Sequence, residues 1–147
     1  MSWKNLLSKR LVQAHKSSRE EIQNLRALIK RDIEDAKISE VSIDRRFATA
    51  YGAAVNLARM AVFCAGYRVL AVAGHHRTSF EAAVGALGPK SEEVCTYFDT
   101  CRRKRNKIDY DFAEVASESE VEDLLDQVLS FQTMIEQWVA ENYPDLK

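Results

Sequence analysis

Apolar residues recur every three to four positions through most of this chain, the spacing that places them on one face of an α-helix. Ser18 and Ser117 each precede such a segment, and a glutamate three residues later completes the capping box typical of helix starts. The pattern predicts helices, in chain order, over residues 3–15, 18–38, 42–65, 78–86, 91–112 and 117–142.

The predicted helix over residues 42–65 is unusually rich in alanine, which permits close approach of neighbouring helices and suits the centre of a bundle. Gly66 follows directly and is expected to end this helix. Thr78 and Glu81 form another capping box, which predicts that the short helix over residues 78–86 begins there.

Composition favours an all-α fold. The 147 residues are 46% apolar, enough for one domain with its own core, and 5 Gly with 2 Pro leave little material for the turns of a β protein. We therefore expect a single domain over residues 1–147, built as an antiparallel four-helix bundle with a core over about 18–142. The segments 3–15 and 78–86 would be additional short helices.

The charge balance excludes a general attraction to nucleic acid, since 22 acidic and 21 basic residues leave a net charge of −1. Any RNA binding must come from a local basic patch. The three cysteines, Cys64, Cys95 and Cys101, lack the paired spacing of a zinc site and are typical of buried thiols in a reducing cytoplasm. No signal peptide or membrane span is expected, so the sequence predicts a cytoplasmic protein with no metal, no cofactor and no membrane partner.

The helix over residues 91–112 carries an arginine in its core-facing phase. Its apolar stripe reads Val94, Phe98, Cys101, Arg105, Ile108 and Phe112. Asp109 lies one turn beyond Arg105, where its carboxylate can hold the guanidinium, while Asn106 and Tyr110 share the neighbouring face. An arginine on an apolar seam is tolerated when it is paired or when the seam opens into a site. A structural ion pair and a functional arginine therefore both stay open.

Two further groups of residues are candidates for contact with phosphate. Arg102, Arg103, Lys104 and Lys107 surround Arg105, and such a run is either a solvated face or a surface that holds an RNA backbone.

His75, His76 and Arg77 precede the helix predicted at residue 78, where outward-facing amide groups favour an anion. The adjacent histidines are expected to point in different directions, which excludes a helical metal-ligand pair. A purely structural role for both histidines is the alternative.

The pair Arg105–Asn106, followed by an aromatic residue at position 110, resembles the signature helix of the HEPN superfamily. That motif consists of Arg, a polar residue that is often Asn, a short spacer and His. The segments 32–36, 46–51, 66–68 and 74–78 fall in the order and spacing associated with the superfamily, so the resemblance covers about residues 20 to 140. Tyr110 stands where the family motif has His.

The resemblance implies a helical domain that pairs as a symmetric homodimer, with the two signature helices facing each other. Active members of the family cleave RNA without metal, the ribose 2′-hydroxyl attacking the adjacent phosphate. Arg105, assisted by Asn106, would then stabilise the developing charge. Tyr110 would donate a proton or a hydrogen bond, since a phenol is a poor base at neutral pH. His75 or His76 would replace the missing imidazole.

The resemblance also implies partners and a positioning role. Asp32 would help to orient the basic motif together with Asp109. The alternative is that Asp32 is an ordinary exposed acid. Family members are often encoded beside a minimal nucleotidyltransferase, an antitoxin that adenylylates a tyrosine two positions beyond the motif His. That position is Phe112 here, which leaves Tyr110 as the group to be modified.

We therefore expect a HEPN-type component of a toxin–antitoxin pair that acts on RNA or nucleotides, with metal-independent endoribonuclease activity weakened by the missing His. The alternative is a non-catalytic dimeric domain that binds a nucleotide or a protein. A purely structural Arg105 ion pair is the third interpretation.

Overall fold

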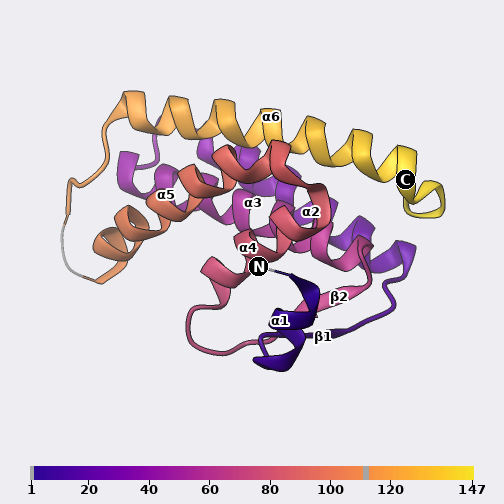
Figure 1. The fold of residues 1–147 in the computed structure, drawn as a ribbon. Coiled ribbons are helices and arrows are strands. Elements are labelled where there is room, and N and C mark those ends of the chain that lie inside the picture. Colours follow the sequence, from indigo (N-terminus) through magenta and orange to yellow (C-terminus); the bar gives the residue numbers. More distant parts are fainter. Residues whose placement is uncertain (1, 111–112) are drawn as a thin grey trace.

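Six α-helices and a small antiparallel sheet make up the described chain in this computed structural model, which describes residues 2–110 and 113–147 (Figure 1). The elements are α1 (Trp3–Ser8), β1 (Val12–Ala14), α2 (Arg19–Ala36), α3 (Ile43–Cys64), β2 (Tyr67–Val69), α4 (His75–Leu87), the 3₁₀ turn η1 (Pro89–Ser91), α5 (Glu92–Tyr110), α6 (Glu118–Asn142) and the 3₁₀ turn η2 (Pro144–Leu146). The predicted helical class is confirmed, whereas the sheet was not expected.

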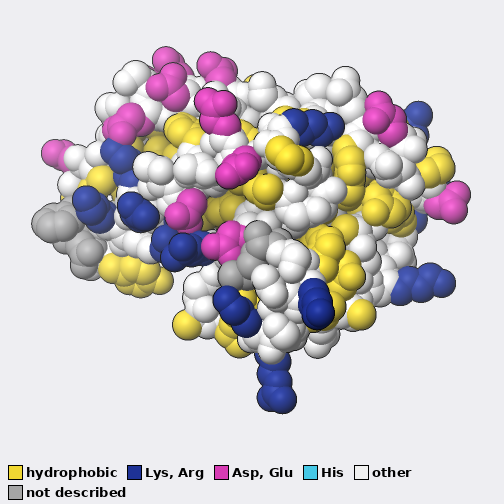
Figure 2. All heavy atoms as spheres, in the orientation of Figure 1, with side chains coloured by type: hydrophobic (Ala, Val, Ile, Leu, Met, Phe, Trp, Pro, Cys, Tyr) yellow, Lys and Arg dark blue, Asp and Glu magenta, His cyan; other side chains and the backbone are white. Residues whose placement is uncertain are grey.

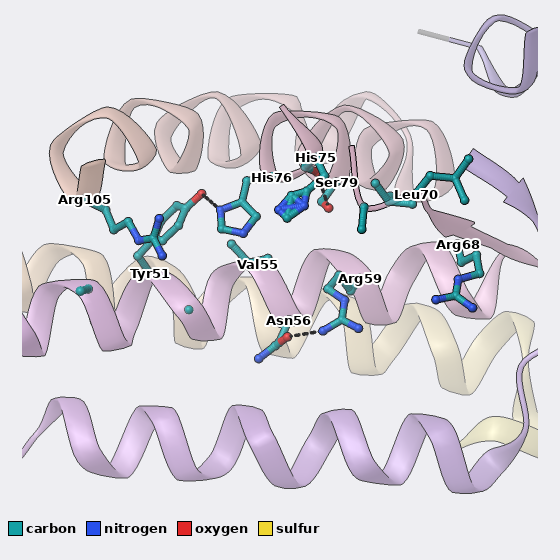
Figure 3. Close-up of a pocket in the computed structure, with 14 residues that line it drawn as sticks. Tyr51, Val55, Asn56, Arg59, Arg68, Leu70, His75, His76, Ser79 and Arg105 are labelled. Atoms are coloured by element: carbon teal, nitrogen blue, oxygen red, sulfur yellow. Dashed lines mark hydrogen bonds between the residues drawn. The ribbon is translucent and has the colours of Figure 1, made fainter. Parts of the chain in front are cut away.

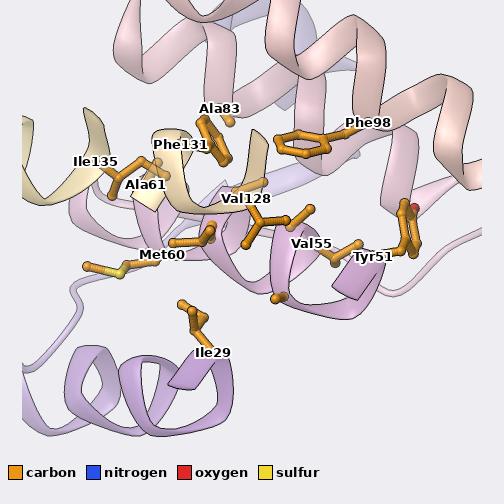
Figure 4. Packing of buried hydrophobic residues seen from close by; sticks show 14 of the residues in the cluster. Ile29, Tyr51, Val55, Met60, Ala61, Ala83, Phe98, Val128, Phe131 and Ile135 are labelled. Atoms are coloured by element: carbon orange, nitrogen blue, oxygen red, sulfur yellow. The ribbon is translucent and has the colours of Figure 1, made fainter. Parts of the chain in front are cut away.

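The alanine-rich helix α3 is the centre of the domain, because α2, α4, α5 and α6 all pack against it. Five of its alanines, Ala50, Ala53, Ala54, Ala58 and Ala61, are fully buried and allow neighbouring helices to approach closely. Figure 4 shows large side chains from the surrounding helices meeting on α3, among them Ile29 from α2, Phe98 from α5 and Phe131 from α6. The core thus lies around α3, and any cleft beside α3 is bordered by several elements.

Helix α3 is also long and apolar enough, by length and composition, to cross a membrane. The sequence analysis predicted no membrane span. Much of α3 is buried inside the domain, and the core helix of a water-soluble protein can be equally long and apolar.

The helix predicted over residues 3–15 is confirmed only for Trp3–Ser8 and is wrong for the rest. Helix α1 ends at Ser8, the chain turns at Arg10 with a positive φ of 55°, and β1 then pairs with β2. The ring of Trp3 stacks on that of Tyr67, with centroids 4.2 Å apart. The partner strand lies far away in sequence, so the local apolar pattern of residues 3–15 contains no sign of the pairing.

The prediction that a short helix begins at Thr78 is also wrong. Helix α4 begins at His75, after Gly74 in a left-handed conformation with φ 79°, and continues to Leu87. The Thr78 hydroxyl lies inside the helix and donates to the carbonyl oxygen of Gly74 at 3.2 Å. Helix α4 is therefore a fifth substantial helix, and both histidines belong to its first turn.

Other local predictions are confirmed. Ser18 and Ser117 form the expected capping boxes at the starts of α2 and α6. Helix α3 ends at Cys64, and Gly66 has the positive φ of 95° that a glycine accommodates. The three cysteines are buried free thiols. The stripe of α5 faces the core up to Ile108, and its last predicted member, Phe112, lies outside the described residues.

Candidate functional site

A pocket of about 410 Å³ opens between α3, β2, the first turn of α4 and the C-terminal half of α5 (Figure 3). We call it the arginine–histidine pocket. Its polar lining consists of Tyr51, Asn56, Arg59, Arg68, His75, His76, Ser79 and Arg105. Among the described residues, no aspartate or glutamate lines it.

Helix α3 forms one wall of the pocket because Tyr51, Val55 and Arg59 are spaced four residues apart and so share one face. At a rise of about 1.5 Å per residue, the eight positions from Tyr51 to Arg59 span about 12 Å along the helix axis. The pocket is therefore elongated, with Arg105 at one end and Arg59 towards the other (Figure 3).

The hydroxyl of Tyr51 lies 3.2 Å from Nδ1 of His76, linking α3 to α4. Burial is the main cause that lowers the pKa of His76 to about 4, and electrostatic interactions with His75 and Arg105 lower it further. Burial also raises the pKa of Tyr51 well above its usual value. At neutral pH the pair is thus an uncharged phenol and an uncharged imidazole.

The sequence analysis expected His75 and His76 to point in different directions, and this prediction is wrong. Their rings stack with centroids 4.6 Å apart and an interplanar angle of 7°, and both line the pocket. No helical turn precedes them in α4, so the usual steric limits on helical side-chain rotamers are relaxed. The stacked rings form a flat surface on the pocket wall, with His75 exposed to solvent.

Arg105 enters the pocket from α5, as its place in the apolar stripe suggested. Its Nε lies 2.9 Å from Oδ2 of Asp109, so the predicted ion pair is present. The two side chains are 28% and 19% exposed, respectively, so the pair is only partly buried. The guanidinium carbon also lies 6.0 Å from the ring centroid of Tyr51. Asp109 therefore holds the arginine at the pocket end without closing the pocket.

Arg59 and Arg68 form a second positive centre, which sequence reasoning did not identify. Burial lowers the pKa of Arg59, and the neighbouring positive charge of Arg68 lowers it further. Nη1 of Arg59 donates to Oδ1 of Asn56 at 2.9 Å. Within the described part of the chain, neither arginine has an ion pair with a carboxylate.

Several predicted site residues do not line this pocket. Tyr110 is 77% exposed at the end of α5. Asn106 is beside Arg105, with its Oδ1 3.5 Å from Nη1, but does not line the pocket. Asp32 is buried on α2 and pairs with Arg31 at 3.0 Å. Its role in orienting Arg105 stays a prediction.

Two of the four basic residues around Arg105, and Arg77 on α4, are paired with acids. Arg102 pairs with Asp99, Lys104 with Glu120, and Arg77 with Glu81. Arg103 and Lys107 are exposed. Figure 2 shows Lys and Arg side chains over the C-terminal part of α5 interspersed with Asp and Glu. This face is of mixed charge, whereas the pocket lining is positive without acids.

The sequence did contain a signal for Arg59 and Arg68, which were not selected as site residues. Arg59 and Arg68 interrupt the most apolar part of the chain, and a charged residue in such a segment marks a place where the core opens. Tyr51 belonged to the segment 46–51 of the family resemblance but was not selected as a site residue.

The donors in the pocket suit an anion. Guanidinium groups bind phosphate or carboxylate oxygens with paired N–H groups, and uncharged imidazole adds a further donor. Nowhere in the described chain do three or more His, Cys, Asp or Glu side chains gather as metal ligands would. Comparison of this chain with family models, curated proteins and solved structures found no match.

Proposed function

We propose that this protein is a HEPN-type helical domain whose arginine–histidine pocket binds a phosphate group of RNA or of a nucleotide. In this proposal α2, α3, α5 and α6 form the antiparallel four-helix bundle of that superfamily. One observation carries the proposal: Arg105 and the pair His75–His76, which were selected from separate parts of the sequence, line the same pocket.

Electrostatics supports a phosphate as the ligand. Three arginines line the pocket and no acid among the described residues does, so an anion would offset repulsion between these positive charges. Phosphate has several acceptor oxygens and can take two N–H groups from one guanidinium. A neutral or positive ligand would leave Arg59 and Arg68 without a counterion among the described residues.

His76 supports binding more directly than catalysis. When the Tyr51 phenol donates to Nδ1 of His76, the ring proton resides on Nε2, and Nε2–H can donate to a phosphate oxygen. With a pKa of about 4, this imidazole is uncharged at neutral pH and is a weak base. We therefore assign His76 a binding role in this proposal.

Metal-independent RNA cleavage is the second candidate function, and the observation that favours it is the exposed His75 ring beside His76. His75 would accept the proton of the ribose 2′-hydroxyl as its oxygen bonds to phosphorus. The bond from phosphorus to the 5′-oxygen would break, and a proton donor such as water would protonate the leaving oxygen. Arg105 would stabilise the additional negative charge on the phosphate.

The family resemblance also supports proposals about assembly. In a homodimer with α5 helices facing each other, Asn106 and Tyr110 of each protomer would border a shared cleft. The exposed hydroxyl of Tyr110 would be accessible to a nucleotidyltransferase, as modification in a toxin–antitoxin pair requires. Arg102, Arg103, Lys104 and Lys107 would then contact an RNA backbone, with Arg77 nearby on α4.

Calorimetric titration with adenosine 5′-monophosphate tests the binding proposal. We expect saturable binding by the parent protein and at least about ten-fold weaker binding by Arg105→Ala, which loses a charge-assisted contact. Arg45→Gln, on an exposed residue of α3 outside the pocket, should bind as the parent does. Equal binding by all three proteins, each confirmed as folded by circular dichroism, would refute the role of Arg105.

The cleavage proposal is tested with a labelled RNA pool in chelator. Cleavage by the parent and by Arg45→Gln, but not by His75→Asn or Arg105→Ala, is the expected pattern. Binding of nucleotide without cleavage of any RNA would refute the cleavage proposal and support the binding function only.

A further inference from the structure

The arginine–histidine pocket has two positive centres rather than one. Arg105 lies at the end marked by Tyr51, and Arg59 with Arg68 lies about two helical turns along α3 (Figure 3). The stacked rings of His75 and His76 lie between the two centres. A single phosphate at Arg105 would therefore leave the far centre without an anion.

The two centres differ in their charge balance. Asp109 pairs with Arg105, whereas the ion pairs of the described residues give neither Arg59 nor Arg68 a carboxylate. Arg59 has other structural contacts, a hydrogen bond to Asn56 and a position 5.8 Å from the ring centroid of Phe63. These contacts are with uncharged groups, so the positive charge of the Arg59–Arg68 centre stays unbalanced.

The fold places Arg68 at this position through the small sheet. Residues 67–69 of β2 pair with β1 in the register Val12↔Val69, Gln13↔Arg68 and Ala14↔Tyr67. The backbone of Arg68 is thus held by hydrogen bonds on the strand, and the side chain approaches the pocket from outside the helical bundle. Two arginines from different elements converge, which costs electrostatic repulsion unless an anion is bound.

We propose that the pocket recognises a nucleoside unit that carries two phosphate groups, as in a nucleoside 3′,5′-bisphosphate, with one phosphate at Arg105 and the other at Arg59 and Arg68. This inference rests on the proposed phosphate-binding function and extends it. The phosphates on opposite sides of a ribose lie farther apart than the adjacent phosphates of a diphosphate, which suits the elongated pocket. The nucleoside would lie against the apolar wall of Val55 and Leu70 and the stacked histidine rings.

The test compares three adenosine nucleotides by calorimetry: the 5′-monophosphate, the 5′-diphosphate and the 3′,5′-bisphosphate. We expect the bisphosphate to bind the parent protein at least about ten-fold more tightly than either other nucleotide, because only it reaches both centres. In Arg68→Gln this advantage should disappear while affinity for the monophosphate stays within about two-fold. Arg68 is exposed, so the variant is expected to fold.

Arg45→Gln is the matched control, since it removes the same charge from an exposed position outside the pocket. It should keep the preference for the bisphosphate, which separates a local contact from an effect of net charge. Equal affinity of the parent for the monophosphate and the bisphosphate would overturn the second subsite and leave the phosphate-binding function intact. An unchanged bisphosphate advantage in Arg68→Gln would also overturn it. No binding of any nucleotide would overturn both proposals.

Discussion

The hydroxyl oxygen of Tyr51 lies 3.2 Å from Nδ1 of His76, and this contact joins the central helix α3 to the first turn of α4. Both groups are partly or fully buried and uncharged at neutral pH, since burial raises the pKa of Tyr51 and lowers that of His76 to about 4. The contact joins the pocket-lining ring of His76 to the buried ring of Tyr51. Protonation of His76 is therefore expected to change the free energy of unfolding.

We expect His76 to make the folded protein less stable as the pH falls from about 6.5 towards 4. The unfolded imidazole, with a pKa near 6.5, binds a proton in this range before the folded one does, so protonation favours unfolding. His76 is only partly buried and solvent screens the effect, so the expected loss is on the order of 1 to 2 kcal/mol. Urea unfolding at pH 7.0, 5.5 and 4.5 measures it.

The variant His76→Asn is the control, because other groups titrate in the same range. The difference in unfolding free energy between parent and variant should become smaller as the pH decreases. A difference that is constant from pH 7.0 to 4.5 would show that the pKa of His76 is not lowered in the folded protein.

Arg105→Ala should cost little stability. The Arg105–Asp109 pair is partly exposed, and such pairs contribute about 1 kcal/mol or less, whereas breaking a fully buried pair costs about 3 to 5 kcal/mol. A double-mutant cycle with Asp109→Ala, measured by urea unfolding, should give a coupling free energy below about 1 kcal/mol. A coupling of several kcal/mol would support the purely structural interpretation of Arg105.

Arg46→Met should be the more damaging arginine substitution. Nε of Arg46 donates to the carbonyl oxygen of Ala36 at 2.8 Å, and the arginine side chain is 9% exposed. Removing the donor leaves an acceptor at the buried end of α2 without its partner, at a cost of about 2 to 3 kcal/mol in unfolding free energy.

Glu118, which pairs with Arg46 at 3.0 Å, is 54% exposed and is the matched comparison. Glu118→Gln should cost less than about 1 kcal/mol, because water can solvate the remaining groups. Equal losses for the two variants in urea unfolding would contradict a dominant role for the contact with Ala36.

Asp44→Ala should loosen the connection between α5 and α6. The Asp44 carboxylate accepts hydrogen bonds from the backbone amides of Val115, at 3.0 Å, and Ala116, at 2.8 Å. Their loss should decrease the unfolding free energy by about 1 to 2 kcal/mol. Asp126→Ala, on an exposed position of α6, should change it by less than about 0.5 kcal/mol, and an equal effect of both substitutions would refute the prediction.

Sequence patterns predicted the long helices because their signals are local. The capping boxes at Ser18 and Ser117 and the apolar stripes depend only on residues within a few turns. The N-terminal segment was misassigned because β1 owes its conformation to β2, more than fifty residues away. The start of helix α4 was predicted at Thr78 instead of His75 because Thr78 has the side chain of a helix cap, although it lies inside the helix.

Part of the site could be predicted because some of its residues also have local sequence signals. Arg105 was identified from its phase in an apolar stripe, and the His75–His76 pair from its place near a helix start. Tyr110 was selected from the family motif, but it lies at the exposed end of α5, outside the pocket. Arg59 and Arg68 gave a weaker signal because each, taken alone, only interrupts an apolar segment.

The sequence by itself determined that the chain is helical, that α3 would be buried at the centre, and that Arg105 would face inward, since each follows from the spacing of apolar residues along one helix. Only the tertiary structure decided that Arg59, Arg68, Arg105 and the two histidines line one pocket. They come from α3, β2, α4 and α5, and their proximity depends on packing and strand pairing between distant segments.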